Sequence, residues 1–180
     1  LCWYLIRETD NNLEKMLYAA KGDYFSYKNI FTGKDIIKFH QMYEDGEKIF
    51  KPSMEKIKNN LNGKDYIAVV TDAIEANAEY YSFGDGEWMP KMIASATLPI
   101  LVRTPSLIDG RRKFDGGVAD PLPVKKAYEM GAKKIIVIRT YEKNFRRKLK
   151  VENYIGALLS REYPKLRKAL LVHDLSLIHI

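Results

Sequence analysis

Residues 114–124 have the sequence FDGGVADPLPV, and this segment restricts the local fold more than any other part of the chain. An aspartate followed by two glycines interrupts a strand pattern, and the prolines after them exclude an ordinary helix interior before Val124. Glycine permits a positive φ and lets another backbone or a ligand approach closely because it has no Cβ, and the prolines stiffen the exit of the loop. The segment therefore predicts a fixed turn that holds the carboxylate of Asp115 in place.

Regular elements are predicted on both sides of this turn. Before it, Asp109-Gly110 suits a two-residue type I′ turn between two short strands, of which the second ends at Asp115. After it, ADPLPVKKAYEMGA (residues 119–132) predicts a helix that tolerates proline in its first turn and ends at Gly131. The apolar run in KKIIVIRT (residues 133–140) predicts a buried parallel strand.

The preceding residues alternate between helical and extended patterns. Helices are predicted at residues 10–22, 33–50 and 51–63 from their apolar spacing and end signals. DYIAVVTDA and AEYYSF predict two strands, the first of them covered on both faces of a sheet. PKMIASATLPIL predicts a short helix that begins at Pro90, stops at Pro99 and packs closely through small residues such as Ser95.

These elements predict an α/β fold with a mixed, mainly parallel sheet flanked by helices. A strand, a helix and a strand in this order form part of a right-handed crossover. Asp115 is then expected at a strand-to-loop edge of the sheet, where α/β folds place ligands. Residues 1–174 are interpreted as the C-terminal portion of a single domain that is truncated at its N-terminus, because the chain opens on LCWYLIRETD without a methionine. Residues 175–180, LSLIHI, resemble the translated read-through of a sequencing adapter and are interpreted as a non-native tail.

Cysteine usage and hydropathy restrict the function classes. The single cysteine, Cys2, and the lack of paired Cys/His spacing predict neither an internal disulfide nor a metal site. No apolar run reaches the roughly 18 to 20 residues that span a bilayer. A cytoplasmic protein without cofactors is expected, with peripheral contact to a membrane as a further expectation.

The net charge of +7 is concentrated in one stretch, because residues 103–150 hold 14 Lys and Arg against 5 Asp and Glu. Such a stretch is typical of a solvated face or of a surface that meets anionic membranes. The candidates for membrane contact are Arg111, Arg112, Lys113 and the cluster from Arg146 to Lys150. No nucleic-acid-binding motif is present, so nucleic acid is not expected as a partner.

Several motifs together resemble those of a known family. The segment from MIASATLPIL through FDGGVADPLPV to KKIIVI, residues 92–138, contains an A-S-x-x-x-P helix, a hairpin, a D-G-G block and a strand pattern. It is similar to the second half of bacterial patatin-like phospholipases. AVVTDAIEANAEYYSF, with Thr71-Asp72, resembles the strand pair before that helix, and a weaker similarity continues to REYPKLRKALL.

The resemblance implies a serine esterase that hydrolyses lipid or phospholipid acyl esters through a Ser-Asp dyad, without histidine, metal or cofactor. The family's motif aspartate falls on Asp115, which would be the general base, with Gly116, Gly117 and Pro123 supporting its loop. A neutral serine is a weak nucleophile and needs such an adjacent base. Ser95 and Pro99 would pack in the wall of the site.

The nucleophile itself is not expected among these residues. The family carries it in a G-x-S-x-G turn, and no serine here has a glycine two residues away on both sides. Ser95 lies within a predicted helix, where packing is the simpler role, and the glycine-rich oxyanion loop is also missing. The histidines, His40, His173 and His179, lie far from the motif in sequence. The chain alone is therefore expected to be inactive, as one half of an enzyme's machinery.

Other interpretations remain open at this stage. Asp115 could form only an Asx-turn that caps the next helix. The protein could be a non-catalytic member of the same family that binds anionic membrane surfaces through its basic face. A flavodoxin-like ligand-binding domain is a third interpretation, supported only by the sheet pattern.

Overall fold

The structure is a computed structural model. It describes residues 24–26, 28–32, 34–50, 63–82, 84, 86–99, 101–104, 106–138, 156–157 and 160–172. Several predictions concern residues outside these ranges. They are the helix at residues 10–22, nearly all of the helix at 51–63, the cluster from Arg146 to Lys150, the histidines at 173 and 179, and the tail at 175–180.

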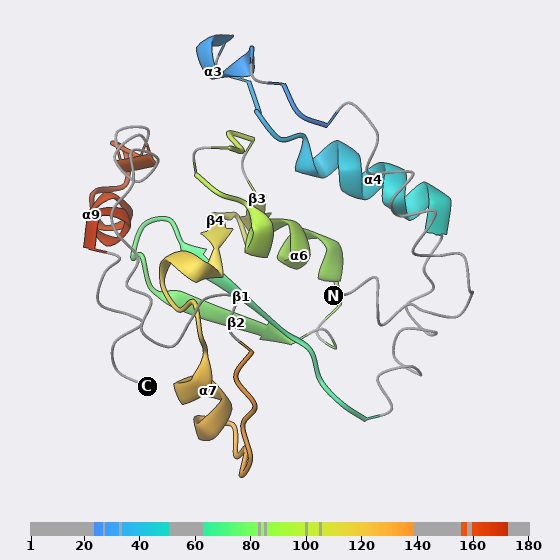
Figure 1. Cartoon of the computed structure of the whole chain (residues 1–180), viewed down its shortest axis with the longest axis vertical. Helices are drawn as coiled ribbons and strands as arrows, with labels where there is room; N and C mark the ends of the chain where they lie inside the picture. The colour runs from blue at the N-terminus through green and yellow to red at the C-terminus, as the bar shows by residue number, and fades with distance from the viewer. Residues whose placement is uncertain are drawn as a thin grey trace.

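A four-stranded sheet lies at the centre of the described chain, with the strand order β2-β1-β4-β3 (Figure 1). Its strands are β1 (Ile67–Asp72), β2 (Ala78–Ser82), β3 (Ser106–Ile108) and β4 (Arg111–Asp115). All three pairings are antiparallel, and Val70 of β1 lies opposite both Glu79 of β2 and Asp115 of β4. The turn between β3 and β4 is the one predicted, because Asp109 and Gly110 have φ angles of 51° and 70°.

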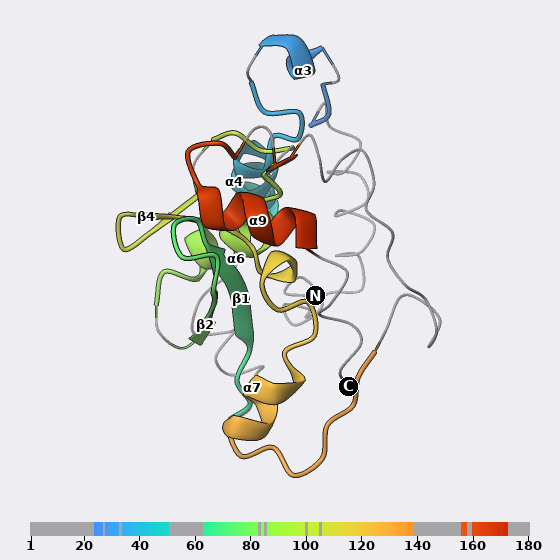
Figure 2. The same ribbon diagram turned by 90° about the vertical axis from the view of Figure 1, so that its left-hand side faces the viewer.

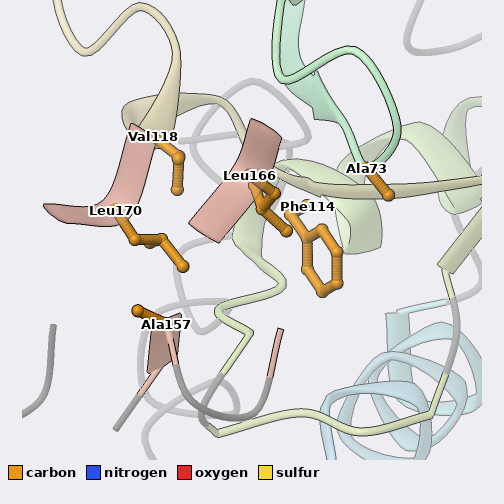
Figure 3. Packing of buried hydrophobic residues seen from close by; sticks show 6 residues of the cluster. All are labelled: Ala73, Phe114, Val118, Ala157, Leu166 and Leu170. Carbon is orange, nitrogen blue, oxygen red and sulfur yellow. The ribbon is translucent and has the colours of Figure 1, made fainter. Parts of the chain in front are cut away.

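Helices cover both faces of this sheet. On one face, Ala94 of α6 (Trp88–Ala96) packs against Val70 and Ile108. Val70 and Phe114 point to opposite faces, since neighbouring residues of a strand alternate and Val70 lies opposite Asp115. The second face carries α9 (Pro164–Val172), which packs on Phe114. Figure 3 shows this second cluster, whose buried members are Ala73, Phe114, Val118, Ala157, Leu166 and Leu170.

Three further α-helices of the described residues lie toward the two ends of the molecule (Figure 1). At one end are α3 (Asn29–Thr32) and α4 (Phe39–Phe50), and α4 lies against α6. At the other end, α7 (Val124–Glu129) and the chain after it extend beyond the sheet in both views (Figures 1 and 2).

The helix predicted at residues 33–50 begins only at Phe39 in the structure. Ile36 and Ile37 are buried before the helix starts, and Ile37 forms an isolated β-bridge with Phe25.

The predicted fold class is wrong. The described sheet is small and antiparallel, with few helices, instead of a mainly parallel sheet of the α/β type. The predicted buried strand in residues 133–140 is also wrong for its described part, which forms no strand and leaves Ile136 and Ile138 90% and 87% exposed. An apolar β-branched run indicates a tendency to extended structure, but it does not say whether a neighbouring strand is present.

The helix predicted in residues 119–132 is confirmed only for residues 124–129, because both prolines precede the helix and neither stands in its first turn. It begins at Val124, directly after Pro123, and Gly131 follows its end with a φ of 91°, which a residue with a side chain rarely adopts. Among the described residues, none of the helices combines the length and apolar character needed to cross a bilayer.

Candidate functional site

Asp115 is the last residue of β4 and directly precedes the 3-10 helix η2 (Gly116–Val118). Its side-chain Oδ1 accepts a hydrogen bond from the backbone N–H of Gly117 at 2.7 Å. The capping role considered for this residue is thus present in the structure. The same hydrogen bond sets the direction of the carboxylate, so the cap also orients a charged group at the end of a strand.

The backbone of Asp115 is held on both sides. Its N–H donates to the carbonyl oxygen of Thr97, at the end of α6, at 2.8 Å. Its carbonyl oxygen accepts from Oγ1 of Thr71 in β1, also at 2.8 Å. Three elements, β1, β4 and α6, therefore place the main chain of Asp115.

Of the two glycines, Gly116 has another backbone segment close to it, as predicted. A Cβ at Gly116 would lie 2.3 Å from the carbonyl oxygen of Val69, which is closer than any real contact of this kind. A Cβ at Gly117 would lie 3.0 Å from Oδ1 of Asp115. Both glycines keep negative φ angles, so space and not a left-handed backbone is what excludes larger residues here.

A second carboxylate in the same loop is tied to the outer strand β2. The hydroxyl of Tyr80 donates to Oδ2 of Asp120 at 2.6 Å, and the Lys126 ammonium lies 5.2 Å from the centre of the Tyr80 ring. Burial, together with the hydrogen bond to Asp120, raises the pKa of Tyr80 to about 12. The N–H of Asp120 also donates to the carbonyl oxygen of Gly116 at 2.8 Å. The hydrogen bond from Tyr80 to Asp120 thus attaches the far end of the loop to strand β2.

A buried ion network lies beside Asp115 on the face of the sheet that α6 covers. The ammonium of Lys113 is 2.7 Å from carboxylate oxygens of both Asp72 and Glu79, and its side chain is 1% exposed. Burial alone would raise the pKa of Asp72, but hydrogen bonds from Lys113 and from two backbone N–H groups outweigh burial and lower this pKa. The Tyr81 hydroxyl donates to Glu79 at 2.6 Å, and burial and this bond raise the pKa of Tyr81.

Residues 111–113 do not form the exposed basic cluster that the sequence suggested. Lys113 points into the ion network, and only Arg111 of the three has a half-exposed side chain, 3.6 Å from Asp72. The Arg112 guanidinium lies 5.0 Å from the centre of the Phe114 ring and donates to a backbone carbonyl. Strand alternation and long-range partners therefore turn two of these cations away from an exposed surface.

The structure also describes the remaining candidate residues, which are Ser95, Pro99, Pro123 and His40. Ser95 is a half-buried residue of α6, and Pro99 is buried just after this helix. Pro123 directly precedes α7, and its carbonyl oxygen accepts the helical hydrogen bond from Ala127. His40 lies on α4, and the part of the chain that the structure describes contains no group of acidic, cysteine or histidine side chains able to hold a metal ion.

Sequence reasoning missed Thr71, Tyr80 and Asp120 as parts of the site. Thr71 and Tyr80 reach the loop only because β1 pairs with β4 on one side and with β2 on the other. A sequence pattern does not contain this register. The one available signal was the second aspartate of DGGVAD, which follows the first by five positions.

Comparison with known proteins gives one distant relative. The chain is 25% identical over 126 residues to the Escherichia coli (strain K12) protein named "Uncharacterized protein YjjU", and the match covers 69% of this chain and 35% of that protein. The chain thus matches about a third of the relative's length. No family model matches the chain, and no solved structure matches it.

Proposed function

We propose that this chain is part of a lipid acyl hydrolase in which Asp115 is the general base for a serine nucleophile supplied by another part of the whole protein. The observation that carries the proposal is the fixed carboxylate at the end of β4, oriented by Gly117 and placed by hydrogen bonds to α6 and β1. The resemblance of residues 92–138 to patatin-like phospholipases supports the same assignment.

The chemistry requires one carboxylate to act twice. Asp115 takes the proton of the serine hydroxyl while the serine oxygen attacks the acyl carbonyl, and the departing alcohol then receives that proton. Water subsequently attacks the acyl-serine and gives one proton to Asp115. As the bond between the acyl carbon and the serine oxygen breaks, Asp115 passes that proton to the serine oxygen, so the fatty acid leaves and both the serine and the base are restored. Both steps need a base whose direction is set before the substrate arrives, since a small misplacement slows proton transfer.

Capping and base catalysis use the same geometry, but a single substitution separates them. Asparagine at position 115 keeps a side-chain oxygen for the N–H of Gly117, so Asp115→Asn should lower stability by about 1 kcal/mol or less. It cannot take a proton from serine, and kcat should fall by about 10³-fold or more, by analogy with other serine hydrolases. The experiment compares kcat on a p-nitrophenyl acyl ester with the melting temperature, using the whole protein.

Asp109→Asn is the matched control, because this exposed aspartate lies in the β3–β4 turn, where asparagine tolerates the positive φ. Its kcat should equal that of the unmodified protein. An Asp115→Asn variant that keeps most of its kcat would show that the turn is only structural. The non-catalytic alternative, membrane binding by a basic face, gains no support from Arg112 and Lys113, since both are engaged within the protein.

A further inference from the structure

We propose that Thr71 is the positioning residue of this site, whose hydroxyl joins the two ends of the turn at residues 115–119 and thereby sets the direction of the Asp115 carboxylate. The inference rests on the proposed function of Asp115. It concerns a residue of β1 that lies 44 positions earlier in the chain.

One hydroxyl group makes both contacts. Oγ1 of Thr71 donates to the carbonyl oxygen of Asp115 at 2.8 Å and accepts from the N–H of Ala119 at 3.2 Å. A hydroxyl supplies one donor and two acceptor positions, so both bonds can exist at the same time. Thr71 is fully buried, so bulk water does not compete with its hydroxyl for these two bonds.

The contacts of Thr71 act on the peptide groups that orient Asp115. The carbonyl that Thr71 holds belongs to the peptide unit between Asp115 and Gly116, and the N–H of the following peptide unit, that of Gly117, binds Oδ1 at 2.7 Å. If that peptide unit rotates, the N–H of Gly117 moves away from the carboxylate. The hydroxyl of Thr71 thus acts on the carboxylate through the backbone and does not touch it.

The adjacent part of β1 leaves the turn few other positions. Gly116 lies close to the carbonyl of Val69, since a Cβ there would be 2.3 Å from its oxygen, so the turn has little room to move closer to the strand. Movement away from the strand is opposed by the two hydrogen bonds that Thr71 makes to this turn. Steric contact on one side and hydrogen bonds on the other together define one position for Asp115.

Two pairs of variants isolate the hydroxyl. Threonine and valine have nearly the same shape, and serine and alanine differ by one oxygen, so each pair differs mainly in whether Oγ is present. Thr71→Val and Thr71→Ala should lower kcat by about 10- to 100-fold with KM changed by less than about twofold, because misplacement of a base by about 1 Å costs rates of this order. Thr71→Ser should keep kcat within about threefold of the unmodified enzyme.

The assay uses the whole protein, with p-nitrophenyl acyl ester turnover and the rate of labelling by a fluorophosphonate, which reports how readily the serine reacts. All rates are divided by the folded fraction at the assay temperature. Tyr24→Phe is the control, because Tyr24 is buried and its hydroxyl donates to Asp45 of α4 at 3.2 Å, away from the turn. It also loses a buried hydroxyl, yet its kcat and labelling rate should not change. If Thr71→Val does not fold, the serine and alanine variants still make the comparison.

The inference is supported if the two variants without the hydroxyl are slow in both assays and the serine variant is not. It is overturned if all three variants have the same rate per folded molecule, since Thr71 would then serve stability alone. Asp115→Asn separates this failure from that of the proposed function. If Asp115→Asn is inactive while the three Thr71 variants are equally fast, only the role of Thr71 is wrong, whereas an active Asp115→Asn refutes both.

Discussion

Lys113→Met should destabilise the protein by about 3 to 5 kcal/mol at pH 7, because it leaves buried carboxylates without their ammonium partner. Methionine fits the volume of the lysine stem but has no charge and no N–H donor. Asp72, 1% exposed, would keep the two backbone N–H groups and Arg111, whose NH1 lies 3.6 Å away. Glu79 is 24% exposed and can gain water, so the loss should fall at the lower end of this range.

The destabilisation should depend on pH in a defined direction. The pKa of Asp72 is lowered in the folded protein, so its contribution to stability is present above the pKa of an unfolded aspartate, about 3.9. This contribution is lost as the pH falls through the lower, folded value. Without Lys113, burial becomes the larger influence and raises the pKa of Asp72. The difference in stability between the two proteins should therefore shrink between pH 7 and about pH 4.

Urea unfolding followed by far-UV circular dichroism at several pH values measures this difference. Lys125→Met is the matched control, because the Lys125 side chain is 90% exposed and its ion pair with Glu129 is long, at 3.9 Å. That substitution should change stability by no more than about 0.5 kcal/mol. A loss below about 1 kcal/mol for Lys113→Met, or a loss that is the same at pH 7 and pH 4, would contradict the description of Lys113 as the centre of a buried ion network.

Gly116→Ala should lower stability by about 3 kcal/mol or more, because the new Cβ would lie 2.3 Å from the carbonyl oxygen of Val69, and a urea midpoint equal to that of the unmodified protein would contradict this. The Tyr80 hydroxyl, with its pKa of about 12, should stay protonated where ordinary tyrosines ionise, near pH 10. The difference in ultraviolet absorbance between the protein and its Tyr80→Phe variant measures this ionisation. Asp120→Asn should lower the pH at which Tyr80 ionises, because it removes the negative charge beside the hydroxyl. Ile136→Lys should change the stability of this chain by less than about 0.5 kcal/mol, because the side chain is 90% exposed, and a larger loss in urea would show that it is packed.

Features that depend on neighbouring residues were predictable from the sequence. The hairpin at Asp109-Gly110 and the C-terminal end of α7 follow from backbone preferences of a few consecutive residues, and the structure contains both. The capping bond of the turn after β4 belongs to the same class, since Asp115 and Gly117, which form it, are only two positions apart. Turn chemistry is local, and that is why a sequence pattern can contain it.

Features that depend on distant partners were not predictable in the same way. The run at residues 135–138 has the composition of a buried strand, but burial needs a second segment, and the described part of the chain places none against Ile136. For Lys113 the prediction failed in the opposite direction, because an exposed side chain was expected and the residue is buried. It stands in a row of three basic residues, which is typical of a solvated surface, yet the pairing of β4 with β1 brings Asp72 within 2.7 Å, and Glu79 of β2 lies at the same distance.

The candidate site contains both local and long-range features. The sequence therefore predicted the turn at Asp115 but not the residue of β1 that holds it. Asp115 and its glycines form a local turn, whereas Thr71 reaches the turn through the register of two strands. A turn held only by its own capping bond would let the carboxylate leave its position whenever that single bond opened. With Thr71 bonded to both ends and Gly116 seated on Val69, the strand β1 opposes each such movement. The same contacts therefore stabilise the turn and orient the carboxylate. Asp115→Asn removes the charge but keeps the capping hydrogen bond, so its activity shows whether the turn supports catalysis or only ends a strand.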